Sequence, residues 1–140
     1  MLHEAAHNLG PAHEYQVNGK ADGAVFGGPL ASTLEELKAQ TAALFFVDWL
    51  ADKGMIDPKA AGQSHLRDLS WAFGHIAQGM YDGDNKPKPY SQLASIQVGW
   101  LLKAGSVQWK AEESAANGKD KGCFAVDMAK FKPAIVELAK

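Results

Sequence analysis

The longest apolar stretch of this chain has the length of a helix rather than that of a strand. It lies within LEELKAQTAALFFVDWLADKG, residues 34–54, where Leu44, Phe45, Phe46 and Trp49 place apolar groups on nearly every side of a helix. Alternation of apolar and polar residues, which is typical of half-buried strands, is scarce in the rest of the sequence. The sequence therefore predicts a mainly α fold with at most a short hairpin. The second half of the long helix has the pattern of a helix buried on all sides, although a domain of 140 residues has little room to bury one in this way.

Local signals predict where the other elements lie. Thr33 with Glu36, or Ser32 with Glu35, forms a Ser/Thr-x-x-Glu pattern that predicts a capping box at the start of the long helix. Further helices are expected over residues 1–8, 58–81 and 90–105 and after Asp127, and the pair Gly10-Pro11 is expected to stop the first of them. Short extended pairs are expected at an Asn18-Gly19 turn and between SVQWK and CFAV.

The predicted helix over residues 58–81 has an apolar stripe at three- and four-residue spacing. The stripe consists of Leu66, Leu69, Phe73, Ile76 and Met80. His65 and Arg67 lie beside it in the sequence, and we interpret both as surface or partner contacts.

Composition and charge are those of one ordinary globular domain. The 140 residues are 46% hydrophobic and 21% charged, so the chain can bury a core. The formal net charge is −2 and Arg67 is the only arginine, so there is no basic stripe for phosphate contacts. No apolar run approaches the roughly 20 residues of a membrane-spanning helix. We expect residues 1–140 to form a single helical domain with no membrane span and no nucleic-acid partner.

A metal-binding pattern opens the chain. The stretch HEAAHNLGPAH contains His3, Glu4, His7, Gly10 and His13, which together spell HExxHxxGxxH. Side chains four residues apart lie one above the other on a helix, so His3 and His7 can bind one ion while Glu4 holds a metal-bound water. A lone cysteine offers no thiolate pair, so His and carboxylate groups must supply the ligands. The pattern predicts a Zn²⁺ site that hydrolyses peptide bonds.

Two residues compete for the third ligand of this site, because catalytic zinc keeps three protein ligands and one open position. His13 is the third ligand in a metzincin-like endopeptidase, where Gly10 lets the chain turn back toward the ion. Glu36 is the third ligand if its helix packs against the first helix. His13 follows Pro11 in a polar segment, whereas Glu36 belongs to a helix apolar enough to enter the core. We favour Glu36 and keep His13 as the alternative.

The motif begins two residues after the start of the sequence, although a catalytic helix is normally braced at both ends. We therefore expect the chain to be part of a larger peptidase, with an N-terminal lobe in the same protein or in another chain. No signal peptide precedes the motif, and the sequence does not distinguish a cytoplasmic from a periplasmic location.

Two motifs in this order resemble the dipeptidyl peptidase III family of zinc metallopeptidases, especially its bacterial members. They are HEAAHNLGPAHEYQVNG and LASTLEELKAQTAALFFVDWLADKGMI, and the later segments DLSWAFG, IQVGWLLKAGSV and CFAVDMAKFKPAIVELA are similar to helical segments that follow the zinc site in that family. The resemblance covers only the zinc-binding helical part of the longer family protein. It implies a helical catalytic lobe, a Zn²⁺ cofactor and an exopeptidase that releases dipeptides from short peptides.

The resemblance also implies roles for individual residues. His3, His7 and Glu36 correspond to the zinc ligands of the family and Glu4 to its general base. Glu35 corresponds to a glutamate that is hydrogen-bonded near the metal.

Two positions depart from the family pattern. Gln40 stands where the family has a glutamate that orients a zinc-bound histidine, and a neutral group there leaves that histidine less basic. His75 lies near, but not at, the place of a family histidine. It is a candidate for contact with the substrate or the transition state, and its alternative role is packing.

These observations lead to one main hypothesis and two alternatives. The main hypothesis is a zinc-dependent metallopeptidase acting on peptides, whose isolated zinc-binding lobe binds zinc but turns over substrate poorly without the missing lobe. The first alternative is the metzincin-like endopeptidase with His13 as a ligand. The second is a non-catalytic zinc-binding module, which Gln40 favours and the intact Glu4 opposes.

Overall fold

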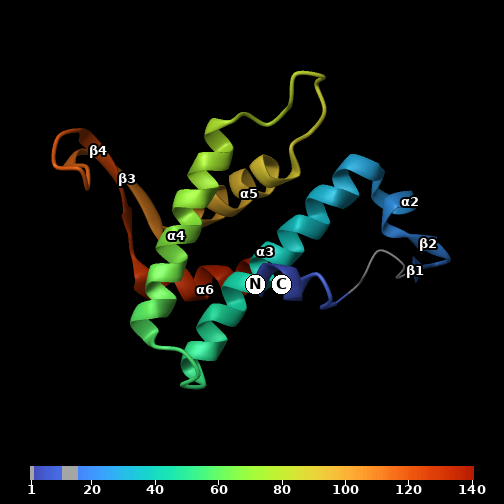
Figure 1. Cartoon of the computed structure of the whole chain (residues 1–140), viewed down its shortest axis with the longest axis horizontal. Helices are drawn as coiled ribbons and strands as arrows, with labels where there is room; N and C mark the ends of the chain where they lie inside the picture. The colour runs from blue at the N-terminus through green and yellow to red at the C-terminus, as the bar shows by residue number, and fades with distance from the viewer. Residues whose placement is uncertain (1, 11–15) are drawn as a thin grey trace.

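The computed structural model describes residues 2–10 and 16–140, and these residues form six helices and two small antiparallel hairpins (Figure 1). The helices are α1 (Leu2–Ala6), α2 (Asp22–Phe26), α3 (Gly28–Asp52), α4 (Pro58–Ala77), α5 (Pro89–Lys103) and α6 (Met128–Leu138). The strands are β1 (Gln16–Val17), β2 (Lys20–Ala21), β3 (Val107–Ser114) and β4 (Lys121–Val126). The predicted mainly helical fold is confirmed.

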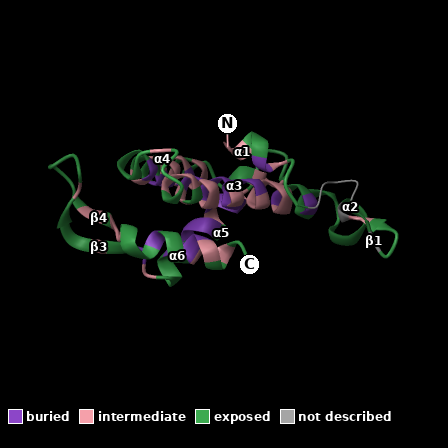
Figure 2. Ribbon diagram, turned by 90° about the horizontal axis from the view of Figure 1, so that it is seen from below, coloured by how far each residue is buried: buried purple, intermediate pink, exposed green. Residues whose placement is uncertain are grey.

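Helix α3 is the central element and contacts each of the other described helices. Helices α1 and α6 lie on opposite sides of it, as Figure 2 shows. Small residues let neighbouring helices approach closely, and Ala39 and Ala43 of α3 are both buried. Since α1 and the residue after it carry the HExxH motif, this arrangement places the motif against the helix that carries Glu36.

The predicted capping box at the start of α3 is wrong. The helix begins at Gly28, with Pro29 in its first turn, and no side chain caps it. Proline is preorganised for the first turn of a helix because its φ is fixed, so Pro29 starts the helix before Thr33 is reached. The Thr33 hydroxyl instead bonds to the carbonyl oxygen of Pro29 and to Gln92 on α5. Glu36 therefore lies about two turns inside α3 rather than at its start.

The second half of the long helix is not buried on all sides, although its apolar pattern is that of such a helix. Trp49 is 41% exposed, and Phe45 and Phe46 are only half-buried. A helix of 25 residues is about 37 Å long, which is more than a domain of this size can enclose. The C-terminal half of α3 therefore has one side exposed to solvent.

The buried stripe of α4 differs in phase from the predicted one. The buried residues are Ala61, His65, Leu69 and Ala72, whereas Leu66 is 46% exposed. These residues recur at three- and four-residue spacing as expected, but small and polar residues occupy the buried side. His65 is therefore a core residue, and its interpretation as a surface contact is wrong.

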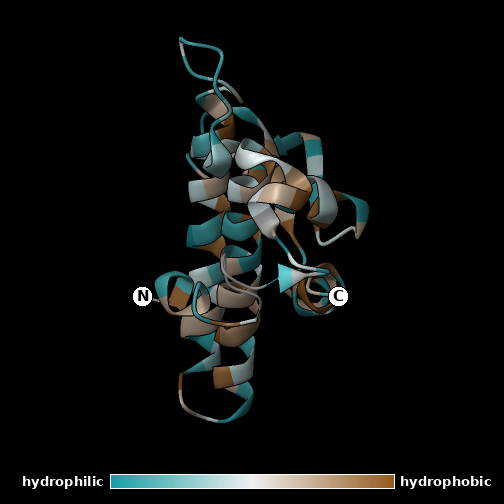
Figure 3. Cartoon of the chain, turned by 90° about the vertical axis from the view of Figure 1, so that its right-hand side faces the viewer, coloured by the Kyte–Doolittle hydropathy of each residue, from teal (hydrophilic) through white to brown (hydrophobic). Residues whose placement is uncertain are grey.

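The hydrophobic core lies where α3, α4, α5 and α6 meet. Phe131, Leu93 and Ile135 are completely buried there, and Val107 at the start of β3 closes one end. Figure 2 shows that the buried residues are concentrated in these helices, whereas the β3–β4 hairpin is largely exposed. The loop between α4 and α5, at the top of Figure 3, is mostly hydrophilic.

Both expected hairpins are present. Strands β1 and β2 are joined by Asn18 and Gly19, whose φ angles of 53° and 74° are those of a tight hairpin turn. Strands β3 and β4 pair antiparallel, with Val107 opposite Val126. The short helix α2 was not among the expected elements. None of the described helices is long and apolar enough to cross a membrane, as expected.

Candidate metal centre

Helix α1 presents two histidines to α3. The backbone N–H of His7 bonds to the carbonyl oxygen of His3 at 3.3 Å, so the helical turn continues past Ala6 and stacks the two side chains. Their ring centroids lie 4.9 Å apart. Ala6 between them is 1% exposed because it packs against the core, which anchors the short helix. The positive φ of Gly10, 70°, then turns the chain away, as predicted.

The two imidazoles converge on one carboxylate oxygen. Nε2 of His3 lies 3.1 Å from Oε2 of Glu36, and Nε2 of His7 lies 3.7 Å from the same atom. The candidate ligand atoms of the three residues are all within 4.8 Å of one another. In a tetrahedral site with zinc–ligand distances of about 2.0–2.2 Å, ligand atoms are roughly 3.3–3.6 Å apart. The two nitrogen–oxygen spacings, 3.1 and 3.7 Å, are close to these values, so the three residues could hold a metal ion.

The Nδ1 atom of each imidazole, which faces away from the candidate metal position, has its own hydrogen-bond partner. Nδ1 of His3 lies 2.8 Å from Oε1 of Gln40, and Nδ1 of His7 lies 2.9 Å from Oε1 of Glu35. Metal-binding histidines are usually held in this way, because a bond to one ring nitrogen aims the lone pair of the other at the ion. Both residues expected near the metal are thus in contact with a candidate ligand.

Glu35 is held as an ionised carboxylate. Burial alone would raise its pKa, but hydrogen bonds from His7 and Lys38, together with the charge of Lys38, outweigh burial and lower the pKa of Glu35. The Nζ atom of Lys38 lies 2.9 Å from Oε1 of Glu35. Glu35 can therefore accept the Nδ1 hydrogen of His7 throughout the neutral pH range.

Asp68 lies behind Gln40 and was not singled out in the sequence. Its carboxylate oxygens accept hydrogen bonds from the side-chain amides of Gln40 on α3 and Gln97 on α5, both of which are buried. Burial raises the pKa of Asp68 to about 6, although the bonds from Gln97 and Gln40 and the nearby imidazoles of His65 and His3 oppose the rise. A chain of hydrogen bonds thus leads from α4 to a candidate ligand.

We expect Asp68 to make stability depend on pH. Its folded-state pKa of about 6 lies above the ordinary value of 3.8, so folding favours the protonated acid. This contribution is fully present below pH 3.8 and is lost as the pH rises through 6. The difference between the two pKa values corresponds to about 3 kcal/mol.

The variant Asp68→Asn cannot ionise, so its stability relative to the wild type is expected to increase by about 3 kcal/mol between about pH 3 and about pH 7. Urea unfolding of the zinc-free protein at several pH values measures this difference. The exposed Asp84→Asn serves as the control and is expected to show no such slope. A pH-independent difference for Asp68→Asn would contradict the expectation.

An open cavity of about 480 Å³ lies beside His3 of α1 and His75 of α4. Glu4 is exposed and lines it, directly beside His3 in the sequence. The other lining residues are His3, Gln40, Ser64, Arg67, Asp68, Trp71, His75 and Tyr90. A molecule in this cavity is therefore close to both the predicted general base and a candidate ligand.

Three rings form one wall of the cavity. Trp71 and His75 of α4 have ring centroids 4.4 Å apart, and Tyr90 of α5 lies 5.6 Å from His75 and 6.3 Å from His3. Burial raises the pKa of the Tyr90 hydroxyl, and the charge of Glu36 and a hydrogen bond to it raise it further. His75 is thus near the candidate centre, with its ring against two aromatic side chains. Trp71 and Tyr90 were not predicted as site residues.

His65 is buried in the core, in the first half of α4. It is 1% exposed, its Nε2 lies 2.9 Å from Oδ1 of Asp48, and its ring lies 4.6 Å from that of Phe131. Arg67, in contrast, is exposed and lines the cavity. His65 therefore has a structural role within the core.

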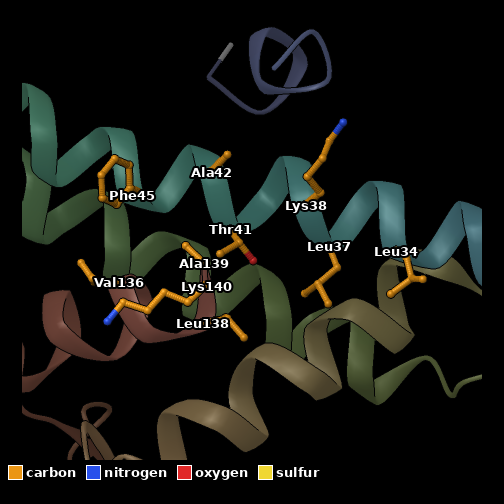
Figure 4. Close-up of a pocket in the computed structure, with 10 residues that line it drawn as sticks. All are labelled: Leu34, Leu37, Lys38, Thr41, Ala42, Phe45, Val136, Leu138, Ala139 and Lys140. Carbon is orange, nitrogen blue, oxygen red and sulfur yellow. The ribbon is translucent and has the colours of Figure 1, made fainter. Parts of the chain in front are cut away.

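A second cavity, of about 630 Å³, lies on the side of α3 that faces away from α1 (Figure 4). Leu34, Leu37 and Thr41 point from α3 toward the C-terminal end of the chain, where Val136 and Leu138 form the opposite wall. None of its lining residues is a candidate metal ligand. It is a mostly apolar groove separate from the metal centre.

The alternative ligand His13 lies outside the described residues, so the geometry bears only on Glu36. No family model matches the chain, and no curated protein or solved structure matches it. The candidate site is therefore interpreted from its own residues.

Proposed function

We propose that this chain is the zinc-binding part of a metallopeptidase similar to the dipeptidyl peptidase III family. The observation that carries the proposal is the convergence of the Nε2 atoms of His3 and His7 on one oxygen of Glu36. Each histidine is held from behind by Gln40 or Glu35. Such a set leaves room for one further ligand, as hydrolytic zinc sites require.

The zinc ion, when bound to these residues, acts as a Lewis acid that polarises a carbonyl group and lowers the pKa of water to about 7. Glu4 is the general base, which accepts a proton from the attacking water and passes it to the leaving amine. Its exposed carboxylate in the open cavity supports this role. A purely structural zinc site needs no such base.

The cavity also suggests how a peptide is held. His75 lies on the same wall as Tyr90, the neighbour of His3, and its imidazole N–H can donate to the carbonyl oxygen under attack. We propose that the groups that hold the peptide N-terminus lie on a second lobe, in the same protein or in another chain. The isolated chain is then a slow peptidase.

Removal and return of the metal test the proposal. We expect the chelator-treated chain to hydrolyse no peptide, and one equivalent of Zn²⁺ to restore slow hydrolysis of short peptides that releases dipeptides from their N-termini. Mass spectrometry of a defined peptide mixture after long incubation identifies the products, and peptides with an acetylated N-terminus serve as the matched control.

The other outcomes distinguish the alternatives. Cleavage at internal bonds that is insensitive to N-terminal acetylation would favour the endopeptidase with His13 as a ligand. Tight zinc binding without any zinc-dependent hydrolysis would favour the non-catalytic module.

A further inference from the structure

We propose that Asp68 is a positioning residue of the metal centre and that it acts on His3 through the side-chain amide of Gln40. The inference rests on the proposed zinc site and adds to it a residue from a third helix. Asp68 belongs to α4, whereas the candidate ligands belong to α1 and α3 or follow α1 directly. Hydrogen bonds connect Asp68 to Gln40 and Gln40 to His3.

The chemistry of Asp68 fixes the orientation of Gln40. An ionised carboxylate only accepts hydrogen bonds, so the amide nitrogens of Gln40 and Gln97 must both face it. This is the observed arrangement, with Nε2 of Gln40 donating to Oδ1 and Nε2 of Gln97 donating to Oδ2. With its nitrogen turned to Asp68, Gln40 must direct its carbonyl oxygen at His3.

The orientation of Gln40 in turn fixes the tautomer of His3. A carbonyl oxygen only accepts, so Nδ1 of His3, 2.8 Å away, must carry the hydrogen. The lone pair of the neutral ring then lies on Nε2, which faces Oε2 of Glu36 at 3.1 Å. A lone pair and a carboxylate oxygen repel each other unless a cation lies between them. The tautomer imposed by Asp68 is therefore the one that binds a metal.

Asp68 also supplies the negative charge that Gln40 lacks. Gln40 is 8% exposed and Gln97 is 1% exposed, so the hydrogen-bond chain lies in a medium where successive bonds polarise one another. A carboxylate on the far side of the amide makes its oxygen a stronger acceptor and His3 a more basic ligand. The neutral Gln40 thus relays a charge that a glutamate at its position would supply directly.

The side chain of Gln97 keeps its nitrogen toward Asp68, although this orientation leaves its oxygen unpaired. Its Oε1 atom is buried and has no hydrogen-bond partner among the described residues, while its nitrogen bonds to Asp68. An unpaired buried oxygen is unfavourable, so the bond to Asp68 determines how Gln97 is oriented. Asp68 is thereby braced from α5 as well as from α3.

Zinc affinity of two Asp68 variants tests the inference. Asp68→Asn keeps an acceptor but removes the charge, and we expect it to weaken zinc binding about tenfold; Asp68→Leu also removes the acceptor, and we expect a loss of about 100-fold. Asp48→Asn is the matched control, because Asp48 bonds to His65 on α4 and lies outside the chain that leads to His3. Zinc affinities of both Asp68 variants within twofold of the wild type would overturn the inference.

A double-mutant cycle separates positioning from general structural damage. In the background Gln40→Met, which cannot relay the charge, Asp68→Asn is expected to change zinc affinity by less than twofold. The full tenfold loss in that background would show that Asp68 acts without Gln40, contrary to the proposal. Urea unfolding of zinc-free Asp68→Asn at the pH of the zinc titration checks that unfolding does not account for weaker zinc binding.

The tautomer of His3 gives a readout that needs no metal. Long-range ¹H–¹⁵N spectra of the zinc-free protein at high pH are expected to show hydrogen on Nδ1 of His3 in the wild type. Asp68→Leu is expected to shift His3 toward the tautomer with hydrogen on Nε2. An Nε2–H tautomer in the wild type, or an unchanged spectrum in the variant, would refute the role of Asp68. If the wild type binds no zinc, the proposed function fails, and these spectra still decide the role of Asp68.

Discussion

Replacing His3 or His7 by alanine is expected to lower the zinc affinity by more than about 100-fold. Each residue contributes one of only three candidate ligand atoms, and changes behind the ligands already cost about 10–100-fold. Isothermal titration of the zinc-free variants with Zn²⁺, in competition with a chelator of known affinity, covers this range.

His75→Ala is the matched control for this prediction. It removes a histidine that lines the same cavity and is not one of the three candidate ligands, so zinc affinity is expected to stay unchanged. Unchanged affinity in both the His3 and His7 variants would place the metal elsewhere.

Replacing Glu4 by glutamine is expected to lower the rate of zinc-dependent peptide hydrolysis about 10²–10⁴-fold, which is the usual contribution of a general base. Glutamine has the shape of glutamate but cannot accept the proton. Zinc affinity is expected to be unchanged, because Glu4 is exposed at the cavity and is not one of the candidate ligands. Progress curves of wild type and variant with equal zinc loading measure the effect.

Glu35→Gln serves as a control, because it is expected to weaken zinc binding and to affect hydrolysis at saturating zinc less than Glu4→Gln does. Glu35 bonds to Nδ1 of His7, so its loss is expected to weaken zinc binding about 10–100-fold. At saturating zinc, its hydrolysis is expected to exceed that of Glu4→Gln. If Glu4→Gln hydrolyses peptides as fast as the wild type, Glu4 is not the base. Equal and negligible hydrolysis by the wild type and by Glu4→Gln would favour a non-catalytic module.

The parts of the site that depend on local spacing could be predicted from the sequence. The four-residue separation of His3 and His7 determines that their side chains stack, and the apolar character of residues 34–54 indicated that the helix of Glu36 enters the core. The structure brings these three residues together. Asn18 and Gly19 likewise identified their hairpin, because both accept a positive φ.

The parts that depend on contacts between distant helices could not be predicted in this way. Asp68, Tyr90 and Gln97 reach the site only because α4 and α5 pack against α3, and no short-range pattern marks them. The start of α3 was missed for a different reason. Two helix-start signals lie close together there, and the helix begins at the earlier one, Pro29, rather than at the Ser/Thr-x-x-Glu pattern.

His65 illustrates a third kind of failure. The apolar stripe on α4 was drawn through large residues such as Leu66, although the buried side is formed by alanines together with His65 and Leu69. A histidine on the buried side needs a polar partner, and Asp48 provides it from α3. That pairing becomes visible only when both helices are in place.

The most direct test of the account is to locate zinc itself. Crystals of the zinc-loaded protein, measured above and below the zinc absorption edge, give an anomalous difference map that marks the ion. We predict one strong peak bound by Nε2 of His3, Nε2 of His7 and a carboxylate oxygen of Glu36, at about 2.0–2.2 Å from each. A peak bound by His13 in place of Glu36, or no peak at the two histidines, would contradict the account.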